Sequence, residues 1–161
     1  MPLIALSTAP KATIFHAPLP SLFMTPHPSQ NEDRLVAHLL QIEDALERLA
    51  FVQDRVKKRP SLAPEHRSDS NRIHGCATKV WLHADHHEGI CHFEVDSESS
   101  VVRGLASLVT EVFSSTLASD AASFHSRIVE RAGLKRIITP TRLHGLAKLE
   151  ESIHAFAEAV R

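Results

Sequence analysis

The stretch ATKVWLHADHHEGICHFEVD, residues 77–96, decides the fold, because apolar and polar residues alternate on both sides of a short turn. Alternation with a period of two is typical of strands that bury one face. We therefore expect one strand over 77–85 and a second over 90–96. A hairpin turn over 86–89 joins them, and Gly89 supplies the positive φ that such a turn needs.

The same alternation assigns the side chains of each strand to a face. In the second strand Cys91, Phe93 and Val95 share one side, so Cys91 is predicted to fill the core instead of serving as a reactive thiol. The first strand divides in the same way, with Thr78, Val80, Leu82 and Ala84 on one face and Lys79, Trp81 and His83 on the other.

Residues with helical spacing precede the hairpin. Capping-box patterns begin at Ser29 and at Asp44, which predicts two helices, over 31–43 and 45–58, instead of one long rod. Pro60 then ends the second helix, because proline cannot continue the hydrogen-bond pattern.

Helical spacing returns after the hairpin. Residues 96–98, Asp-Ser-Glu, offer a cap and the early negative charge typical of a helix start, so we expect a long helix to begin there. A shorter helix over 119–131 is closed by Gly133 in the left-handed conformation. Thr139-Pro140 is the predicted start of the last helix.

The order of helices, hairpin and helices indicates the fold class. It predicts an α+β domain, in which a small antiparallel sheet has helices packed on one face. At 161 residues with 43% hydrophobic residues, the chain can bury one core. We place this domain at 31–161. Residues 1–30 contain six prolines and no acidic residue, which predicts a disordered tail, with a targeting segment as the alternative.

Composition excludes several classes of function. The formal net charge of −1 argues against nucleic-acid binding, which usually requires a basic surface. No apolar run approaches the roughly 20 residues of a membrane span. Two cysteines make no disulfide framework and favour a reducing compartment. A cytoplasmic location is therefore expected, or an organellar one if residues 1–30 form a transit peptide.

The other cysteine, Cys76, is the candidate for chemistry. It follows Gly75 between an irregular loop and the first strand, where a thiol can be exposed and mobile. A nucleophilic thiol must also ionise, and Arg72, His74 and Lys79 are close enough in sequence to favour the thiolate. The alternative is that this cysteine is buried and structural, as most core cysteines are.

Several motifs recur in order along the chain and resemble one known family. They are Asn71-Arg72-Ile73-His74-Gly75-Cys76-Ala77-Thr78-Lys79-Val80-Trp81-Leu82, His92-Phe93-Glu94-Val95-Asp96-Ser97-Glu98-Ser99, Val101-Val102-Arg103-Gly104-Leu105, Ile138-Thr139-Pro140-Thr141-Arg142 and Gly145-Leu146. Together they resemble the SufE family of sulfur acceptor proteins over about residues 44–161. The resemblance implies the fold of that family, which is similar to that of iron–sulfur cluster scaffold proteins.

The resemblance also implies an activity. SufE-type proteins accept sulfur from a cysteine desulfurase, so Cys76 is expected to carry that sulfur as a persulfide. The chain would stimulate the desulfurase, a SufS-like enzyme, and pass the sulfur to an iron–sulfur scaffold complex. It would act as an activator of that enzyme instead of as a stand-alone enzyme. No cofactor is expected on the chain itself, because the pyridoxal phosphate belongs to the desulfurase.

Supporting site residues follow from the same resemblance. Arg142 matches an arginine of the family and is expected near the docking face or beside the anionic sulfur, with a surface ion pair as the alternative. Thr78 replaces a serine of the family and keeps its hydroxyl group. His74 precedes the Gly-Cys pair and is expected to support the site.

A carried persulfide needs shelter from water. We expect Ile73, Trp81 and residues of the last helix to line a partly apolar pocket for it. Asp96 and Glu98 are expected to be helix-start residues, and Glu98 is also a candidate to influence the mobility of the Cys76 loop.

Two other functions stay open at this point. His83, His86, His87, Cys91 and His92 crowd one hairpin, and zinc sites use such ligands, although the spacing is not a known zinc signature. The third possibility is a protein-interaction domain without chemistry. We expect no metal-ligating and no cofactor-binding residue if the sulfur-carrier interpretation holds.

Overall fold

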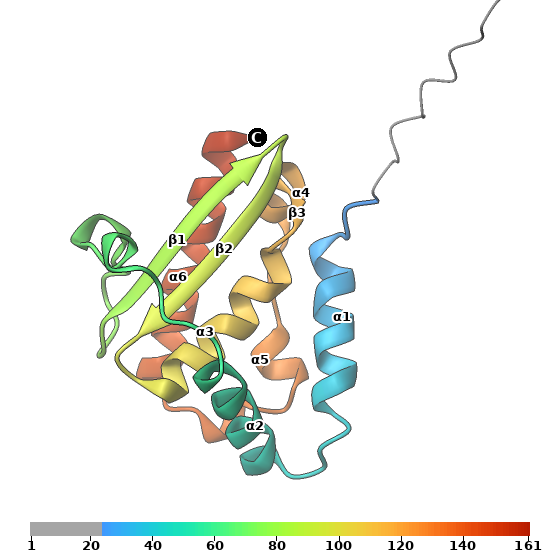
Figure 1. Cartoon of the computed structure of the whole chain (residues 1–161). Coiled ribbons are helices and arrows are strands. Elements are labelled where there is room, and N and C mark those ends of the chain that lie inside the picture. The colour runs from blue at the N-terminus through green and yellow to red at the C-terminus, as the bar shows by residue number, and fades with distance from the viewer. Residues whose placement is uncertain (1–23) are drawn as a thin grey trace, which may run out of the picture.

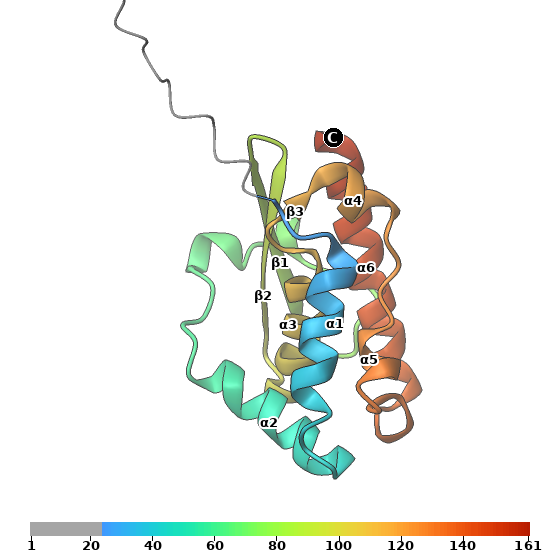
Figure 2. The same ribbon diagram turned by 90° about the vertical axis from the view of Figure 1, so that its right-hand side faces the viewer.

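The computed structural model describes residues 24–161 and places helices on one face of a small sheet, which confirms the predicted α+β class. In Figure 1 the two long strands lie in front of α3 and α6, and Figure 2 shows these helices on one side of the sheet. The elements are α1 (Pro28–Leu39), α2 (Ala45–Lys57), η1 (Pro64–His66), η2 (Asp69–Asn71), β1 (Val80–His87), β2 (Ile90–Ser97), α3 (Ser100–Phe113), β3 (Thr116–Leu117), α4 (Ala118–Ser123), α5 (Ile128–Arg131), η3 (Lys135–Ile137) and α6 (Pro140–Val160).

The hairpin forms as the alternation predicts. β1 and β2 pair antiparallel in a register that runs from Val80 opposite Ser97 to His87 opposite Ile90. The turn is two residues shorter than predicted, because the strands continue up to Glu88 and Gly89. Both turn residues have positive φ, 51° and 78°, as a two-residue hairpin turn of the primed type requires. The short β3 pairs with the outer edge of β2 and was not predicted.

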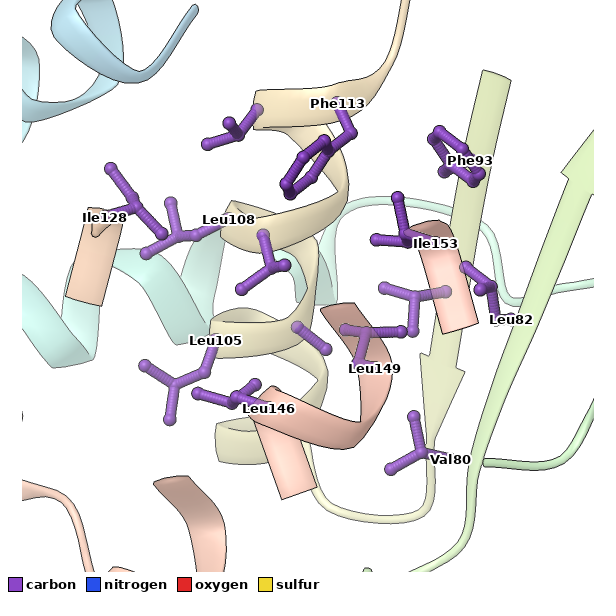
Figure 3. Packing of buried hydrophobic residues seen from close by; sticks show 14 of the residues in the cluster. Val80, Leu82, Phe93, Leu105, Leu108, Phe113, Ile128, Leu146, Leu149 and Ile153 are labelled. Carbon is purple, nitrogen blue, oxygen red and sulfur yellow. The ribbon is translucent and has the colours of Figure 1, made fainter. Parts of the chain in front are cut away.

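The core lies between the inner face of the hairpin and the two long helices. Figure 3 shows Val80, Leu82 and Phe93 of the sheet facing Leu149 and Ile153 of α6, with α3 alongside. Cys91 is completely buried in this cluster, so its prediction as a core residue is confirmed. Burial of these apolar side chains is the main stabilising contribution that holds α3 and α6 to the sheet.

The predicted start of the long helix is wrong. Asp96 is a buried residue near the end of β2, which continues to Ser97. α3 begins at Ser100 with Ser99 as its cap, whose side chain accepts a hydrogen bond from the backbone N–H of Val102. Glu98 is an exposed residue in the turn before α3. Alternation alone cannot reveal this, because the strand continues through two polar residues, Asp96 and Ser97, that are buried.

Buried Asp96 holds the loop that leads to Cys76. Its carboxylate accepts a hydrogen bond from the backbone N–H of Leu62 at 3.1 Å and lies 3.3 Å from Nε of Arg103 in α3. Nε of Arg67 lies 3.6 Å from the same carboxylate. One side chain therefore connects the loop over 60–75, the end of β2 and the first turns of α3.

Buried Glu32 explains why the predicted helix over 119–131 is split into α4 and α5. From α1, its carboxylate accepts hydrogen bonds from Oγ of Ser126 and the backbone N–H of Arg127, at 2.8 and 2.9 Å. Arg131 donates a third at 2.9 Å. These hydrogen bonds engage the side chain of Ser126 and the backbone N–H of Arg127, in the segment between α4 and α5. That segment therefore does not continue the helix.

The remaining helix ends divide between confirmed and corrected predictions. Asp44 caps α2, Thr139 caps α6, and Gly133 has a φ of 69°. α1 begins at Pro28 with His27 as its cap, so the predicted cap at Ser29 is wrong.

The predicted tail over 1–30 falls mostly outside the described residues. Within residues 24–161, no helix combines the length and the apolar character needed to cross a membrane.

Candidate functional site

A cavity of about 290 Å³ lies beside Cys76, between the loop before β1, α3 and the start of α6. Its wall is mostly apolar and is formed by side chains of β1, α3 and α6. These are Val80, Val102, Leu105, Ala106, Leu146 and Leu149. Polar groups from Ser99, Thr139 and Thr141 complete the lining. The cavity therefore combines an apolar interior with a few hydroxyl groups, as small ligand sites commonly do.

Cys76 is half-buried where the loop meets α6. The preceding Gly75 has a φ of 88°, which turns the chain just before the thiol. Sγ of Cys76 lies 3.8 Å from the backbone carbonyl oxygen of Gly145 and donates a weak hydrogen bond to it. A Cβ atom at Gly145 would lie only 3.0 Å from Sγ. The absence of a side chain at this position of α6 is what admits the sulfur.

The charge state of the thiol is set by two opposing effects. Burial raises the pKa of the Cys76 thiol above the ordinary value of a cysteine, and the positive charge of Arg72 lowers it by less. The predicted influence of Arg72 thus has the expected sign, but burial has the larger effect on the pKa of Cys76. Lys79 pairs with Glu98, at 3.4 Å between Nζ and Oε1. Burial of Cys76 therefore favours the protonated thiol over the thiolate.

Two predicted site residues lie in the cavity wall with Cys76. They are Thr78 in the loop and Arg142 in the first turn of α6. Among residues 24–161, no carboxylate lies within ion-pair distance of Arg142, which leaves the alternative of a surface ion pair without support there.

The predicted role of Trp81 and Ile73 in the pocket is wrong. Trp81 faces the opposite side of the sheet, where the guanidinium group of Arg67 lies 4.6 Å from the centre of its ring. Ile73 is buried in the core, and its backbone N–H donates to the carbonyl of Val80. Because strand residues alternate, Val80 faces the cavity and its neighbour Trp81 cannot.

The other two predicted supporting residues lie at the rim of the site. His74 is exposed, two residues before Cys76, and does not line the cavity. Glu98 does not line it either, but its ion pair with Lys79 connects the turn before α3 to the Cys76 loop. Its influence on the mobility of that loop stays a prediction.

Sequence reasoning missed the contribution of α3 to the cavity. Val102, Leu105 and Ala106 were recognisable only as apolar helix positions, and nothing local distinguishes a cavity wall from a packed core. Gly145 was recognisable as part of a motif. Why glycine is needed there was not, because its close contact is with Sγ of Cys76, 69 positions away in the chain.

The histidines of the hairpin do not gather into a metal site. His83 stacks on His66 on one side of the sheet, with 3.7 Å between ring centres, whereas His86 lies near Phe156 of α6 on the other. Cys91 is buried between the sheet and the helices. In the described part of the chain, the one group of three ligand-type residues with atoms within 4.8 Å of one another is His125, Glu150 and His154, outside the hairpin.

A comparison with protein families supports the resemblance inferred from the motifs. The family model "SufE: Fe-S metabolism associated domain" matches residues 33–157, which include Cys76 and Gly145. This chain belongs to the SufE family. An uncharacterized SufE-like protein of Rhizobium etli is 30% identical over 131 residues, which cover 78% of this chain and 88% of that protein. The SufE assignment places the protein in Fe–S metabolism.

A solved structure has the same fold. The solution structure of a hypothetical protein from Thermus thermophilus superposes with a TM-score of 0.66 at 20% identity, over 81% of this chain and 95% of that one. At this identity the likeness shows the fold alone. The SufE fold thus positions Cys76 at the junction of the sheet, α3 and α6.

Proposed function

We propose that this protein is a sulfur acceptor that takes persulfide sulfur from a cysteine desulfurase onto Cys76 and delivers it to iron–sulfur cluster assembly. The observation that carries the proposal is the position of Cys76, whose sulfur lies against Gly145 at an apolar cavity. Membership in a family of Fe–S metabolism supports the same direction.

The transfer is an exchange at sulfur. The thiolate of Cys76 attacks the outer sulfur atom of the desulfurase persulfide, and a bond forms between Sγ and that atom. The bond between the two sulfur atoms of the donor breaks, and the desulfurase cysteine leaves as a thiolate. The proton lost by Cys76 neutralises that leaving thiolate, so the step needs no external oxidant or reductant.

The resting state of Cys76 suits a carrier. Burial raises the pKa of the thiol, so the unloaded protein does not present a free thiolate to oxidants or metal ions in solution. Docking must therefore expose and ionise the thiol. Arg72 already favours the charged form, and contact with a partner adds to this effect where it moves Cys76 away from the apolar wall.

Arg142 and Thr78 are the proposed supporting residues. Both line the cavity next to Cys76, one with a guanidinium group and the other with a hydroxyl. A loaded persulfide is more acidic than a thiol and carries negative charge, which a cation and a hydrogen-bond donor stabilise. The chain supplies no cofactor to this step, because the pyridoxal phosphate that releases the sulfur is held by the desulfurase.

The test is a mass measurement. The full chain is mixed with a SufS-like cysteine desulfurase and free cysteine, and intact and peptide masses are taken without reductant. We expect one added sulfur atom on the peptide that contains Cys76. The desulfurase should also turn over faster when the chain is present.

Two matched variants locate the acceptor. Cys76→Ser should abolish both the added mass and the stimulation, whereas Cys91→Ser, which removes the buried thiol, should retain both in its folded fraction. An unmodified Cys76 beside an active desulfurase would overturn the proposal. If the parent chain bound the desulfurase and neither cysteine gained sulfur, an interaction domain without chemistry would replace the sulfur acceptor as the proposed function.

A further inference from the structure

Three potential metal ligands meet on the side of α6 that faces away from Cys76. Nδ1 of His125 lies 3.7 Å from Oε1 of Glu150, and Nε2 of His154 lies 3.6 Å from the same oxygen. One ligand atom from each residue lies within 4.8 Å of the other two. The two histidine rings meet edge to face, with 5.0 Å between their centres.

Two elements hold these side chains together. Glu150 and His154 lie four residues apart on α6 and therefore share one helix face. His125 comes from the segment between α4 and α5. That segment is fastened to α6 on both sides of His125, because the backbone N–H of Ser126 donates to Glu150 at 2.9 Å and Nε2 of His154 lies 2.7 Å from the carbonyl oxygen of Phe124.

The spacing suits a small divalent cation with nitrogen and oxygen ligands. Zinc binds histidine nitrogen and carboxylate oxygen at about 2.0–2.2 Å, so two ligands in tetrahedral geometry lie roughly 3.3–3.5 Å apart. The two observed distances to Glu150, 3.6 and 3.7 Å, differ from this by a few tenths of an ångström. The ring of His125 is exposed and free to rotate toward Glu150, and a small adjustment of the His154 and Glu150 side chains closes the other distance.

We propose that His125, Glu150 and His154 form a binding site for a zinc-class divalent cation, with water at the remaining position. The ion takes the place of the hydrogen that Nε2 of His154 shares with the carbonyl of Phe124, and the neutral imidazole then carries its one hydrogen on Nδ1. Binding thus exchanges the hydrogen bond between His154 and Phe124 for a metal bridge from His125 to α6, which fastens the segment over 124–126 to that helix. The site thus has a role in stability that is separate from sulfur transfer.

Helix geometry keeps this site apart from the thiol. Gly145 contacts Cys76, and successive residues of an α-helix are rotated by about 100°. Five and nine residues further along, Glu150 and His154 therefore point roughly 140° and 180° away from that contact. A metal ion bound there does not touch the sulfur.

The test is a zinc titration of the full chain against a chromogenic chelator. We expect one tightly bound equivalent, and affinity at least about tenfold lower in His125→Ala and in Glu150→Gln. The side chain of His125 is 82% exposed and Glu150→Gln retains an oxygen for Ser126, so both variants should fold, which circular dichroism checks. The matched control is His87→Ala, an 85% exposed histidine at the hairpin turn, which should bind within about twofold of the parent chain.

A second readout identifies the ligand type. Cobalt bound in place of zinc should give the visible bands of a tetrahedral ion without the ultraviolet band of a thiolate ligand, and Cys76→Ser should leave these bands unchanged. The proposal is overturned if no stoichiometric ion binds, if His125→Ala binds as the parent does, or if binding is lost in Cys76→Ser or His87→Ala.

Discussion

At the scale of single residues, the site depends on the absence of a Cβ atom at Gly145. Glycine in a helix interior is less stable than alanine by up to about 1 kcal/mol. At Gly145, however, a Cβ atom would lie 3.0 Å from Sγ of Cys76, closer than side-chain atoms normally approach. Glycine at this position makes α6 less stable, but it allows Sγ of Cys76 to lie against the backbone of that helix.

The pKa of Cys76 gives a prediction on the same scale. Because burial raises this pKa, alkylation of the thiol in the isolated chain should increase with pH and reach half its maximum rate above the midpoint of a free cysteine peptide. Arg72→Gln removes the positive charge that opposes the effect of burial, so its midpoint should lie higher still. The measurement is the rate of iodoacetamide labelling of the Cys76 peptide as a function of pH.

The control for this experiment keeps the charge and changes the geometry. Arg72→Lys retains a cation, so its midpoint should stay closer to the parent's than that of Arg72→Gln. A midpoint at or below that of the free peptide would contradict the dominance of burial over the charge of Arg72.

The sequence singled out Cys76 as the candidate thiol but did not predict the direction of its pKa shift. Cys76 was recognisable from Gly75, the following strand and the motif it belongs to. The sign of the pKa shift was not, because the wall that buries the thiol comes from α6, far along the chain. Of the cations that are close in sequence, Arg72 has less effect than burial, and Lys79 pairs with Glu98.

At the scale of elements, the hairpin was the most predictable part of the fold. A strict alternation fixes its register, because a shift by one residue would exchange the buried and exposed faces. Its turn is less well suited to its conformation, since Glu88 has a φ of 51°. Left-handed backbone is unfavourable for glutamate and tolerated by asparagine.

Glu88→Asn should therefore stabilise the protein. Asn-Gly is the preferred pair for this turn, and the expected gain in the free energy of unfolding is about 0.5–1 kcal/mol. Urea unfolding at constant pH measures it. Glu88→Ala is the matched control, because it removes the same exposed charge without relieving the backbone and should give no gain. Equal gains in both variants would assign the effect to charge instead.

Elements that depend on distant partners were mispredicted. The segment over 119–131 has helical spacing throughout, yet Glu32 of α1 binds its middle and divides it. Asp96 resembles a helix cap in the sequence, yet it is a buried strand residue that pairs with Arg103. In both cases a carboxylate makes its contacts outside its own element, and no local pattern reports this.

At the scale of the whole molecule, buried polar side chains hold the peripheral elements to the core. Asn31 donates hydrogen bonds to the carbonyls of Val112 and Ser114, at 3.0 and 3.2 Å, and attaches α1 to the end of α3. Its neighbour Glu32 attaches the same helix to α5 and the segment before it. Position and orientation of α1 thus depend on two adjacent residues that sequence analysis could assign only to a helix start.

Two neighbouring carboxylates of α1, Glu32 and Asp33, differ in burial and so allow a test of this attachment. Glu32 is 2% exposed and accepts three hydrogen bonds, so Glu32→Ala should lower the free energy of unfolding by about 2–4 kcal/mol. Asp33 forms one ion pair with Arg131, and its side chain is 63% exposed, so Asp33→Ala should cost less than about 1 kcal/mol. Urea unfolding compares them, and the slope with urea should be unchanged if unfolding stays a single transition.

Similar losses in the two variants would mean that charge near Arg131, and not the buried connection between α1 and α5, provides the stability. Because Glu32 lies outside the cavity beside Cys76, the folded fraction of Glu32→Ala should still accept sulfur at the parent rate.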